Sequence, residues 1–314
     1  MIRAFQPTDL SGLVMLASRS LENLACPRER LAETPRRVRA APGLVAAWMM
    51  PGREREQTFL WTPQRGGGGL LSCRSRADFS TWEADLLLLD TAHTEEFCRE
   101  FLGRLGPRAA DAKIMRLFLR LTADSPLRES VQKAGFTPYV QESLYVRRNR
   151  RDDVLVPFSL PGLRRRRPTD ELGLQRLYNR ATPYGVRLAE GITLPQWQES
   201  MAVRWRSGRG GEDWVMERDD VLIAWVRTAV TGRTGYLSLY VHPDHQGVFA
   251  DVVKFGLAHL SGRNFTSLLL PEYQTGNITS VERLGFEKTE DFISFVWEAP
   301  AKVPNSGLVP AQIA

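Results

Sequence analysis

The sequence predicts an α/β protein made of two tandem domains with the same plan, and an internal repeat carries this prediction. The motif Arg-x-x-x-Pro-Thr-Asp-x-x-Gly-Leu occurs at residues 3–13 and again at 164–174. A second motif, Ser-Val-x-x-x-Gly-Phe, occurs in the same order at 130–136 and at 280–286. Solenoid repeats are only roughly 20–50 residues long, so this spacing indicates a duplicated domain. The length of 314 residues also fits about two domains.

The two motifs set the predicted domain limits. The first domain is expected at 1–148 and the second at 163–299, with a polar linker at 149–162 and a tail at 300–314. Each half is long enough to form its own hydrophobic core. We therefore expect two separate α/β domains that superpose with the same order of strands.

Apolar patterning and turn residues predict the elements of the first half. The Pro-Thr-Asp sequence at 7–9 begins a helix, with Thr8 or Asp9 as its N-cap. Further helices are expected at 29–39, 94–105 and 126–135. Strands are expected at 2–5, 57–62, 70–76, 82–89, 114–121 and 139–146.

The second half follows the same plan. Thr169 or Asp170 caps its first helix, and Asp219-Asp220 forms a hairpin turn. The other helices are expected at 194–206, at 249–260 and in a segment that ends at Gly285. The strands are expected at 163–166, 214–217, 221–230, 235–241, 265–270 and 292–297.

Composition excludes several classes of function. An apolar fraction of 43% with 25% charged residues is typical of a soluble globular protein. There is no stretch of roughly 18 apolar residues and no signal-like N-terminus, so we expect no membrane association and a cytoplasmic location. The net charge of +6 is too small to suggest nucleic acid as a partner. The three cysteines, Cys26, Cys73 and Cys98, all lie in the first half, and we expect no metal site.

One stretch of the second half resembles a known family. Residues 237–247, Leu-Ser-Leu-Tyr-Val-His-Pro-Asp-His-Gln-Gly, run from an expected strand through a loop into a helix. They resemble the acetyl-CoA loop of the GCN5-related N-acetyltransferase superfamily, as does the helix ending Glu-Arg-Leu-Gly-Phe at 282–286. The resemblance covers nearly the whole chain. It implies two tandem acyl-CoA N-acyltransferase-like domains, each a mixed, mostly antiparallel sheet flanked by helices.

The resemblance implies acetyl-CoA as co-substrate, with its pyrophosphate on free backbone N–H groups at a helix start. The family pattern is Gln/Arg-x-x-Gly-x-Gly/Ala. Here Gln246 matches, but Phe249 and Asp251 occupy the two glycine positions. The cofactor-binding residues that the resemblance implies are Tyr240, Val241, Gln246, Gly247, Val248, Phe249, Ala250, Asp251 and Asn277.

The first half departs further from the pattern. Its corresponding loop, Asp-Thr-Ala-His-Thr-Glu-Glu at 90–96, has no glycine and carries three carboxylates. These would repel a pyrophosphate, so we expect the first half to be a non-catalytic copy.

The family often has a tyrosine four residues before the late glycine, as an acid for the CoA thiolate. That position holds Val131 in the first half and Val281 in the second. Glu272 and Tyr273 are the nearby substitutes: a carboxylate accepts a proton from an amine, and a phenol protonates a thiolate. Ordinary loop residues are the alternative interpretation for both. His242 is either a turn residue or a base.

Tyr184 and Arg187 follow the first helix of the second half, where the resembled family has part of its acceptor site; a surface loop is the alternative. The predicted function is an N-acetyltransferase that passes acetyl from acetyl-CoA to an unidentified primary amine, a small molecule or a peptide. The amine would attack directly in a ternary complex. The alternative is an inactive ligand-binding or regulatory protein with the same fold. The sequence does not indicate an oligomeric state.

Overall fold

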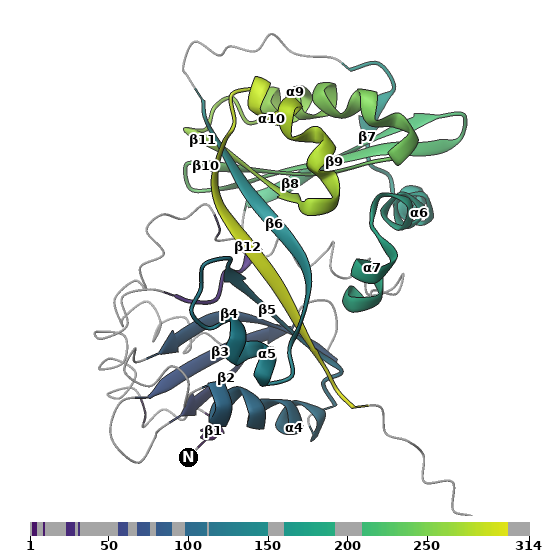
Figure 1. Cartoon of the computed structure of the whole chain (residues 1–314). Helices are drawn as coiled ribbons and strands as arrows, with labels where there is room; N and C mark the ends of the chain where they lie inside the picture. Colours follow the sequence, from purple (N-terminus) through teal and green to yellow (C-terminus); the bar gives the residue numbers. More distant parts are fainter. Residues whose placement is uncertain are drawn as a thin grey trace, which may run out of the picture.

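The computed structural model describes residues 2–4, 9, 23–28, 31, 56–61, 68–75, 80–89, 98–111, 113–149, 160–191 and 209–300. These residues form one mixed sheet of 12 strands with helices packed on it (Figure 1). Among the paired strands, β4 with β5 and β10 with β11 are parallel, and the others are antiparallel. The predicted α/β class with a mostly antiparallel sheet is confirmed.

Within the described residues, the first repeat supplies six strands and three helical segments. The strands are β1 (Ile2–Ala4), β2 (Glu56–Trp61), β3 (Gly69–Ser75), β4 (Thr81–Leu89), β5 (Arg116–Thr122) and β6 (Thr137–Arg148). The helical segments are the π-helix η4 (Cys98–Leu102), α4 (Gly103–Asp111) and α5 (Arg128–Lys133). The helix expected at 29–39 lies outside the described residues, apart from Leu31.

The second repeat has the corresponding elements. Its strands are β7 (Leu163–Arg165), β8 (Arg209–Arg218), β9 (Val221–Thr231), β10 (Thr234–Val241), β11 (Phe265–Pro271) and β12 (Glu287–Glu298). Its helical segments are η5 (Pro168–Asp170), α6 (Glu171–Ala181), α7 (Tyr184–Glu190), η6 (Pro243–Val248), α9 (Phe249–His259), η7 (Glu272–Asn277) and α10 (Ile278–Arg283). The helix expected at 194–206 and the tail beyond Pro300 lie outside the described residues, as does most of the linker.

The closing strands of the two repeats are exchanged. The strand order is β1-β2-β3-β4-β5-β12-β6-β11-β10-β9-β8-β7. β12 of the second repeat therefore pairs with β5 of the first, and β6 of the first pairs with β11 of the second. β6 and β12 also pair with each other, and Figure 1 shows them side by side across the middle of the molecule.

This exchange corrects one expectation and confirms another. Five strands of each repeat do follow the same order, β1 to β5 and β7 to β11. The expectation of two separate sheets is wrong, because each closing strand has 12 residues, roughly 40 Å when extended, and reaches both halves. The domain limits drawn at 148 and 163 remain a prediction about the duplicated sequence. In space, β6 pairs with β11 and so completes the second half of the sheet.

The exchanged strands also join the hydrophobic cores. Ile293, Phe295 and Trp297 of β12 belong to the core of the first repeat, and Tyr145 of β6 belongs to that of the second. A side chain at Gly106 of α4 would meet the Trp297 ring at 2.6 Å, so helix and ring are in close contact. Each core therefore depends on a strand from the other repeat.

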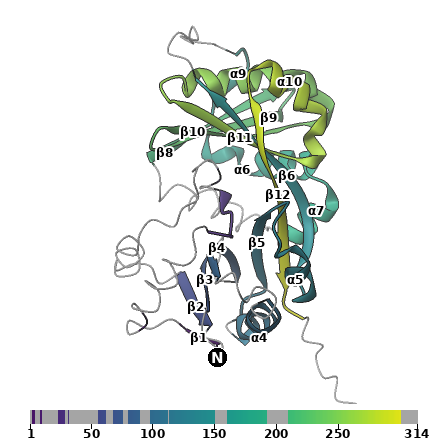
Figure 2. The ribbon, with the colours of Figure 1, turned by 60° about the vertical axis from the view of Figure 1, so that its left-hand side comes forward.

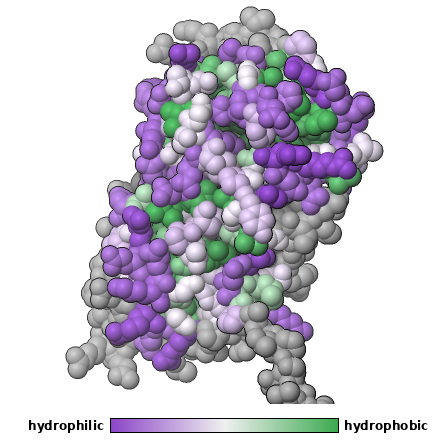
Figure 3. Space-filling model, turned by 45° about the vertical axis from the view of Figure 1, so that its right-hand side comes forward, coloured by the Kyte–Doolittle hydropathy of each residue, from purple (hydrophilic) through white to green (hydrophobic). Residues whose placement is uncertain are grey.

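Helices cover both faces of the second part of the sheet. α9 and α10 pack on one face, and α6 lies on the other (Figures 1 and 2). α6 belongs to a separate core cluster, in which Leu174 and Leu177 pack against Trp225. On the face drawn in Figure 3, hydrophilic residues predominate and hydrophobic ones show as smaller patches.

The repeated motifs are structural. In the first motif of the second repeat, Arg164 donates two hydrogen bonds, at 2.7 and 2.8 Å, to the carboxylate of Asp170. The hydrogen bond from Arg164 holds the pKa of Asp170 below its ordinary value. In the second motif Gly135 and Gly285 adopt φ values of +91° and +81°, which end α5 and α10.

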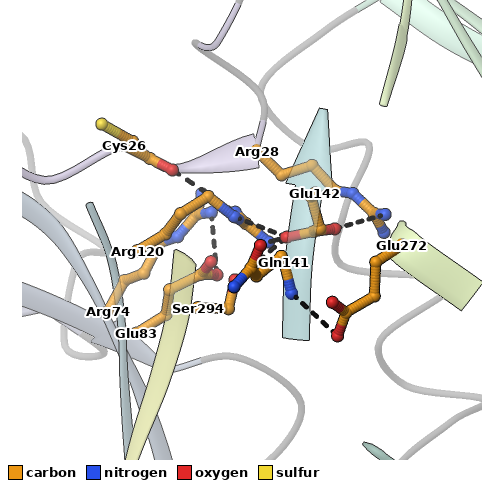
Figure 4. A network of polar contacts seen from close by, with 9 residues as sticks. All are labelled: Cys26, Arg28, Arg74, Glu83, Arg120, Gln141, Glu142, Glu272 and Ser294. Carbon is orange, nitrogen blue, oxygen red and sulfur yellow. Dashed lines mark hydrogen bonds and ion pairs between the residues drawn. The ribbon is translucent and has the colours of Figure 1, made fainter. Parts of the chain in front are cut away.

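A buried carboxylate fastens the exchanged strands together. Glu142 of β6 is 5% exposed and accepts hydrogen bonds from Arg120 of β5 at 2.8 Å and Ser294 of β12 at 2.9 Å. Arg28 donates to its other oxygen at 3.4 Å. The two arginines approach Glu142 from opposite sides (Figure 4). Burial alone would raise the pKa of Glu142, but Arg120 and Arg28 hold it below its ordinary value.

We predict that Glu142→Gln lowers the free energy of unfolding by about 3 kcal/mol, because it leaves the buried Arg120 guanidinium without a counter-charge. Urea denaturation measures the loss. The matched control is Glu298→Gln, since Glu298 is 55% exposed and pairs with Arg116 at 3.0 Å. That exposed pair should contribute less than about 1 kcal/mol. Equal losses in the two variants would contradict the assigned role of Glu142.

The same residue should contribute to acid sensitivity. Its pKa in the folded protein lies below the ordinary value of 4.5, so its stabilisation is present above that pH. It is lost as the pH falls from 4.5 through the folded-state pKa. Denaturation midpoints between pH 7 and 3 should therefore fall more steeply for the wild type than for Glu142→Gln. Parallel pH profiles would show that Glu142 is not the group responsible.

Candidate functional site

The candidate site begins where β10 and β11 separate. These parallel strands pair only over residues 234–237 and 265–268. β10 continues to Val241 and β11 to Pro271, and within the described residues no pairing between them follows. A gap therefore opens at the carboxyl ends of two parallel strands, where open α/β sheets commonly bind ligands.

A pocket of about 310 Å³ lies at this gap. It is lined by the end of β10, the turn η6, the start of α9 and the turn η7, with one residue from α6. The lining residues are Ala181, Val241, Pro243, Gln246, Phe249, Tyr273, Gln274, Gly276 and Asn277. The structure thus brings five predicted site residues together: Val241, Gln246, Phe249, Tyr273 and Asn277.

The other predicted residues lie nearby but are not among those that line the pocket. These are Tyr240, Gly247, Val248, Ala250, Asp251 and Glu272. Four lining residues were not predicted from the sequence: Ala181, Pro243, Gln274 and Gly276. Pro243 lies inside the resembling stretch, whereas Ala181 comes from α6, which no local motif connects to the loop.

Gln246 holds the loop to the strand. Its side-chain amide donates to the carbonyl of Val241 at 3.3 Å and to that of His242 at 3.1 Å. Its Oε1 accepts from Nδ2 of Asn277 at 2.9 Å. This chain of bonds links β10, η6 and η7 around the pocket, so Gln246 and Asn277 shape the site.

His242 is a turn residue in this structure. Its Nδ1 accepts a hydrogen bond from the backbone N–H of Asp244 at 3.2 Å and caps η6. The capping role matches the turn interpretation made from the sequence.

The start of α9 tolerates the two residues that replace the family glycines. Phe249 is 1% exposed and packs into the core, although it also borders the pocket. Asp251 forms an exposed ion pair with Lys254 at 3.0 Å, which offsets part of its charge. A side chain added at Gly247 would meet nothing within 4 Å. The N–H of Phe249, the first residue of α9, already donates to the carbonyl of Gln246 in η6.

Three phenols and a carboxylate gather beside the gap. The Tyr178 hydroxyl of α6 donates to Oε2 of Glu190 in α7 at 2.5 Å. Its ring meets that of Tyr240 edge-on, with 5.7 Å between centroids, and Tyr240 stacks on Trp225 at 5.3 Å. Burial, followed by the charge of Glu190, raises the pKa of Tyr178 well above its ordinary range.

Tyr273 belongs to the same group. Burial, followed by interactions with Tyr240 and Glu190, raises the pKa of its phenol above the ordinary range. The phenol is therefore protonated at neutral pH, and Tyr273 lines the pocket. Glu190 is a candidate that sequence reasoning missed, because the family motif carries no signal for it.

Glu272 is directed elsewhere. It is exposed, and its Oε1 accepts from the backbone N–H of Gln141 in β6 at 3.4 Å (Figure 4). Tyr184 and Arg187 of α7 are also surface residues: Tyr184 is 70% exposed, and the Arg187 guanidinium lies over its ring at 5.6 Å. The residue of α7 that reaches the phenols is Glu190, at its C-terminal end.

Val281 occupies a core position. It is completely buried, as is Val131 in the first repeat, and it packs among apolar residues of the second core. A tyrosine at 281 would overpack this core, so the position has no room for the phenol that the resembled family often carries there.

The first repeat has the same strand gap, but its own chain fills it. β4 and β5 pair only over residues 81–83 and 116–118 within the described residues. Beyond that point residues 23–26 lie between the two strands. Leu24 N–H donates to the Leu87 carbonyl at 3.0 Å, and Cys26 N–H donates to the Arg120 carbonyl at 3.0 Å.

The Asn23 side chain adds two hydrogen bonds that hold residues 23–26 in the gap. Its Oδ1 accepts from Leu87 N–H at 2.8 Å, and its Nδ2 donates to the Asp85 carbonyl at 2.8 Å. Ala25 and Cys26 are 1% and 2% exposed. A ligand in this gap would have to displace residues 23–26. The acidic loop at 90–96 lies outside the described residues.

The described part of the chain holds neither a cluster of metal ligands nor a helix that could span a membrane. It contains no cluster of three or more His, Cys, Asp or Glu side chains placed to hold a metal ion. None of its helices has both the length and the apolar character that crossing a membrane requires.

Comparisons with known proteins place this fold. No protein-family model and no curated protein sequence matches the chain. Among solved structures, it is similar to a GCN5-related N-acetyltransferase from Sphaerobacter thermophilus, with 14% identity, a TM-score of 0.57 and 95% of each chain covered. It is also similar to a tandem protein of this superfamily from the clavulanic acid biosynthesis pathway, with 14% identity, a TM-score of 0.56, and 95% and 98% covered.

A third similar structure is N-myristoyltransferase from Saccharomyces cerevisiae with bound myristoyl-CoA. The identity is 11% and the TM-score 0.50, over 95% of this chain and 82% of that one. The first two similarities extend over nearly the full length of both chains, so they include both repeats and the exchanged strands. The chain therefore has the fold of the GCN5-related N-acetyltransferases.

Proposed function

We propose that the protein is an N-acetyltransferase that uses acetyl-CoA as co-substrate and an amine as acceptor, with one working site at the β10–β11 gap. The observation that carries this proposal is the contrast between two equivalent gaps. One opens on a pocket of about 310 Å³, and residues 23–26 fill the other. In the first repeat the chain's own residues fill the gap and stabilise the fold. In the second repeat the equivalent gap stays accessible.

The proposed cofactor position follows from the chemistry of the gap. We place the pyrophosphate at the start of α9, where the helix end carries a partial positive charge. The backbone of 238–241 faces the gap and offers hydrogen bonds to the amide groups of the pantetheine arm. Val241 and Phe249 supply apolar contact in the pocket between these two regions. A backbone N–H of β10 would polarise the thioester carbonyl.

The proposed reaction is a direct attack. The acceptor nitrogen forms a bond to the thioester carbon, the carbon–sulfur bond breaks, and CoA leaves as a thiolate that takes a proton. Thiols have a pKa near 8.5 and phenols near 10, so complete proton transfer from Tyr273 to the thiolate is unfavourable. We assign Tyr273 to donate a hydrogen bond to the departing sulfur, with solvent supplying the proton.

The acceptor must lose a proton before or during the attack. Glu272 was the carboxylate favoured by its sequence position, but its bond to Gln141 N–H directs it toward β6. Glu190 is better placed, because Tyr178 holds it beside Tyr240 at the gap. We propose Glu190 as the base, acting directly or through a water molecule, with Tyr178 as its positioning residue.

A binding protein without turnover is the second candidate. The buried Val281 at the position of the family acid favours it, as do Phe249 and Asp251 at the glycine positions. Titration calorimetry with acetyl-CoA and a thiol-release assay across an amine panel separate the two functions. Binding with no release of CoA for any amine would favour the second candidate.

Replacing Gly247 tests the cofactor position. Gly247→Glu should abolish the thermal stabilisation by acetyl-CoA, because it adds a negative charge beside the proposed pyrophosphate site while the fold has room for the side chain. Saturating ligand at about 100 times Kd stabilises a protein by about 2.7 kcal/mol. The matched control is Gly262→Glu, beyond the other end of α9, where a side chain also meets nothing within 4 Å. Full stabilisation of Gly247→Glu would refute the proposed position.

Replacing Tyr273 tests its proposed hydrogen bond to the departing sulfur of CoA. Tyr273→Phe should lower kcat by at least about tenfold, because a hydrogen bond to a charged group contributes about 1.5–3 kcal/mol and about 1.4 kcal/mol is tenfold in rate. The binding of acetyl-CoA should stay unchanged. Thiol release measures the rate, and Tyr184→Phe is the control because Tyr184 is 70% exposed. An unchanged kcat in Tyr273→Phe would remove Tyr273 from the mechanism.

A further inference from the structure

A positively charged side chain of the first repeat, Arg28, lies beside the candidate site of the second repeat. Residues 23–26 are fixed between β4 and β5 by their hydrogen bonds, and Arg28 follows two residues later. Arg28 contacts Glu142 at 3.4 Å, and its side chain remains 33% exposed. The segment that closes one gap therefore positions a partly accessible guanidinium.

The strand register shows where this guanidinium lies. Glu142 of β6 is directly opposite Pro271 of β11, the residue before Glu272 and Tyr273. Figure 4 shows Arg28 and Glu272 on the same side of Glu142. Arg28 thus lies where η7 begins, at the side of the gap that faces the first repeat. The pKa of Arg28 supports this position: burial alone would lower it, but Glu142, then Tyr240, Glu190 and Tyr273, raise it above its ordinary value.

Arg28 is available for a further anion. Glu142 already accepts hydrogen bonds from Arg120 and Ser294 through Oε2, and Arg28 reaches only Oε1, at a long 3.4 Å. A guanidinium has five N–H donors in a planar fork, which suits a carboxylate. Glu272 lies on the same side of Glu142 as Arg28 (Figure 4), and the charge of Glu190 acts on Arg28, so a dianionic phosphate would meet two carboxylates. A monoanion is repelled less, and these same carboxylates attract an ammonium group.

We propose that Arg28 binds a carboxylate of the acceptor, so that the acceptor is an amine of the amino-acid type. The ammonium group lies toward Glu190 and the carboxylate toward Arg28. This inference rests on the proposed function, because it names the substrate class for that site. The first repeat then contributes a specificity residue to the reaction although its own gap is filled.

Matched pairs of amines test this proposal. Each pair is an amino acid and the amine that lacks its carboxylate: lysine with cadaverine, ornithine with putrescine, and phenylalanine with phenethylamine. Binding of acetyl-CoA is measured first by calorimetry, because its absence would refute the proposed function separately. The assay is thiol release with the full-length protein. If no amine is turned over, the readout is calorimetric binding of the same pairs to the protein saturated with CoA.

The carboxylated member of at least one pair should be favoured by about tenfold or more in kcat/KM, or in Kd where there is no turnover. Arg28→Gln should remove this preference by raising KM for the amino acid, with kcat and the values for the plain amine unchanged. Arg28→Lys should retain part of it, because the charge remains. The control is Arg165→Gln, since Arg165 is 73% exposed and pairs with Glu212 at the β7–β8 edge.

Several results would overturn the proposal. Equal use of both members of every pair would do so, as would equal effects of Arg28→Gln on both members or no binding of any amine. Preference for phosphoethanolamine over all the amino acids would overturn the carboxylate assignment. Urea denaturation of Arg28→Gln and Arg28→Lys identifies a loss of folding, and Arg28→Lys keeps the test valid if Arg28→Gln is unstable.

Discussion

The pairing of β6 with β12 is the constraint on which the rest of the molecule depends. These two strands join the halves of the sheet, and each carries core residues into the other repeat. The pairing brings Glu142 next to Ser294 and within reach of Arg120. It also sets Glu142 opposite Pro271, so the central ionic cluster lies directly beside the start of η7. The candidate site is therefore built against the contact between the repeats.

The two repeats show two uses of one geometrical feature. In each, a pair of parallel strands separates after a short paired stretch and exposes backbone groups in the middle of a sheet. Unpaired backbone N–H and C=O groups in such a place need partners. In the first repeat Asn23, Leu24 and Cys26 supply them from within the chain. In the second repeat the pocket leaves that role open to a ligand.

Much of the fold was predictable from the sequence, because the repeat motifs and the turn residues act locally. Gly135 and Gly285 end the equivalent helices α5 and α10, and the Arg164–Asp170 pair fixes the start of the first helix of the second repeat. The strand exchange was not predictable, since β6 and β12 would show the same apolar pattern in either half of the sheet. Part of the site was also recoverable: Val241 and Gln246 lie in the resembling stretch, Phe249 follows in the family loop pattern, and Tyr273 was the substitute for the missing acid. Glu190 and Arg28 were missed because tertiary contacts alone bring them to the gap.

The exchange of closing strands has a consequence for the order in which the chain folds during synthesis. β5 ends at Thr122, yet its partner β12 begins at Glu287, so the first half of the sheet lacks a neighbour until nearly the whole second repeat has been made. Contacts so distant in sequence form slowly, and an open strand edge is prone to wrong pairing while it waits. Such a chain cannot discard its first repeat in evolution without leaving β12 unsupported. The filled gap of the first repeat is thus retained because the fold needs the strands on either side of it.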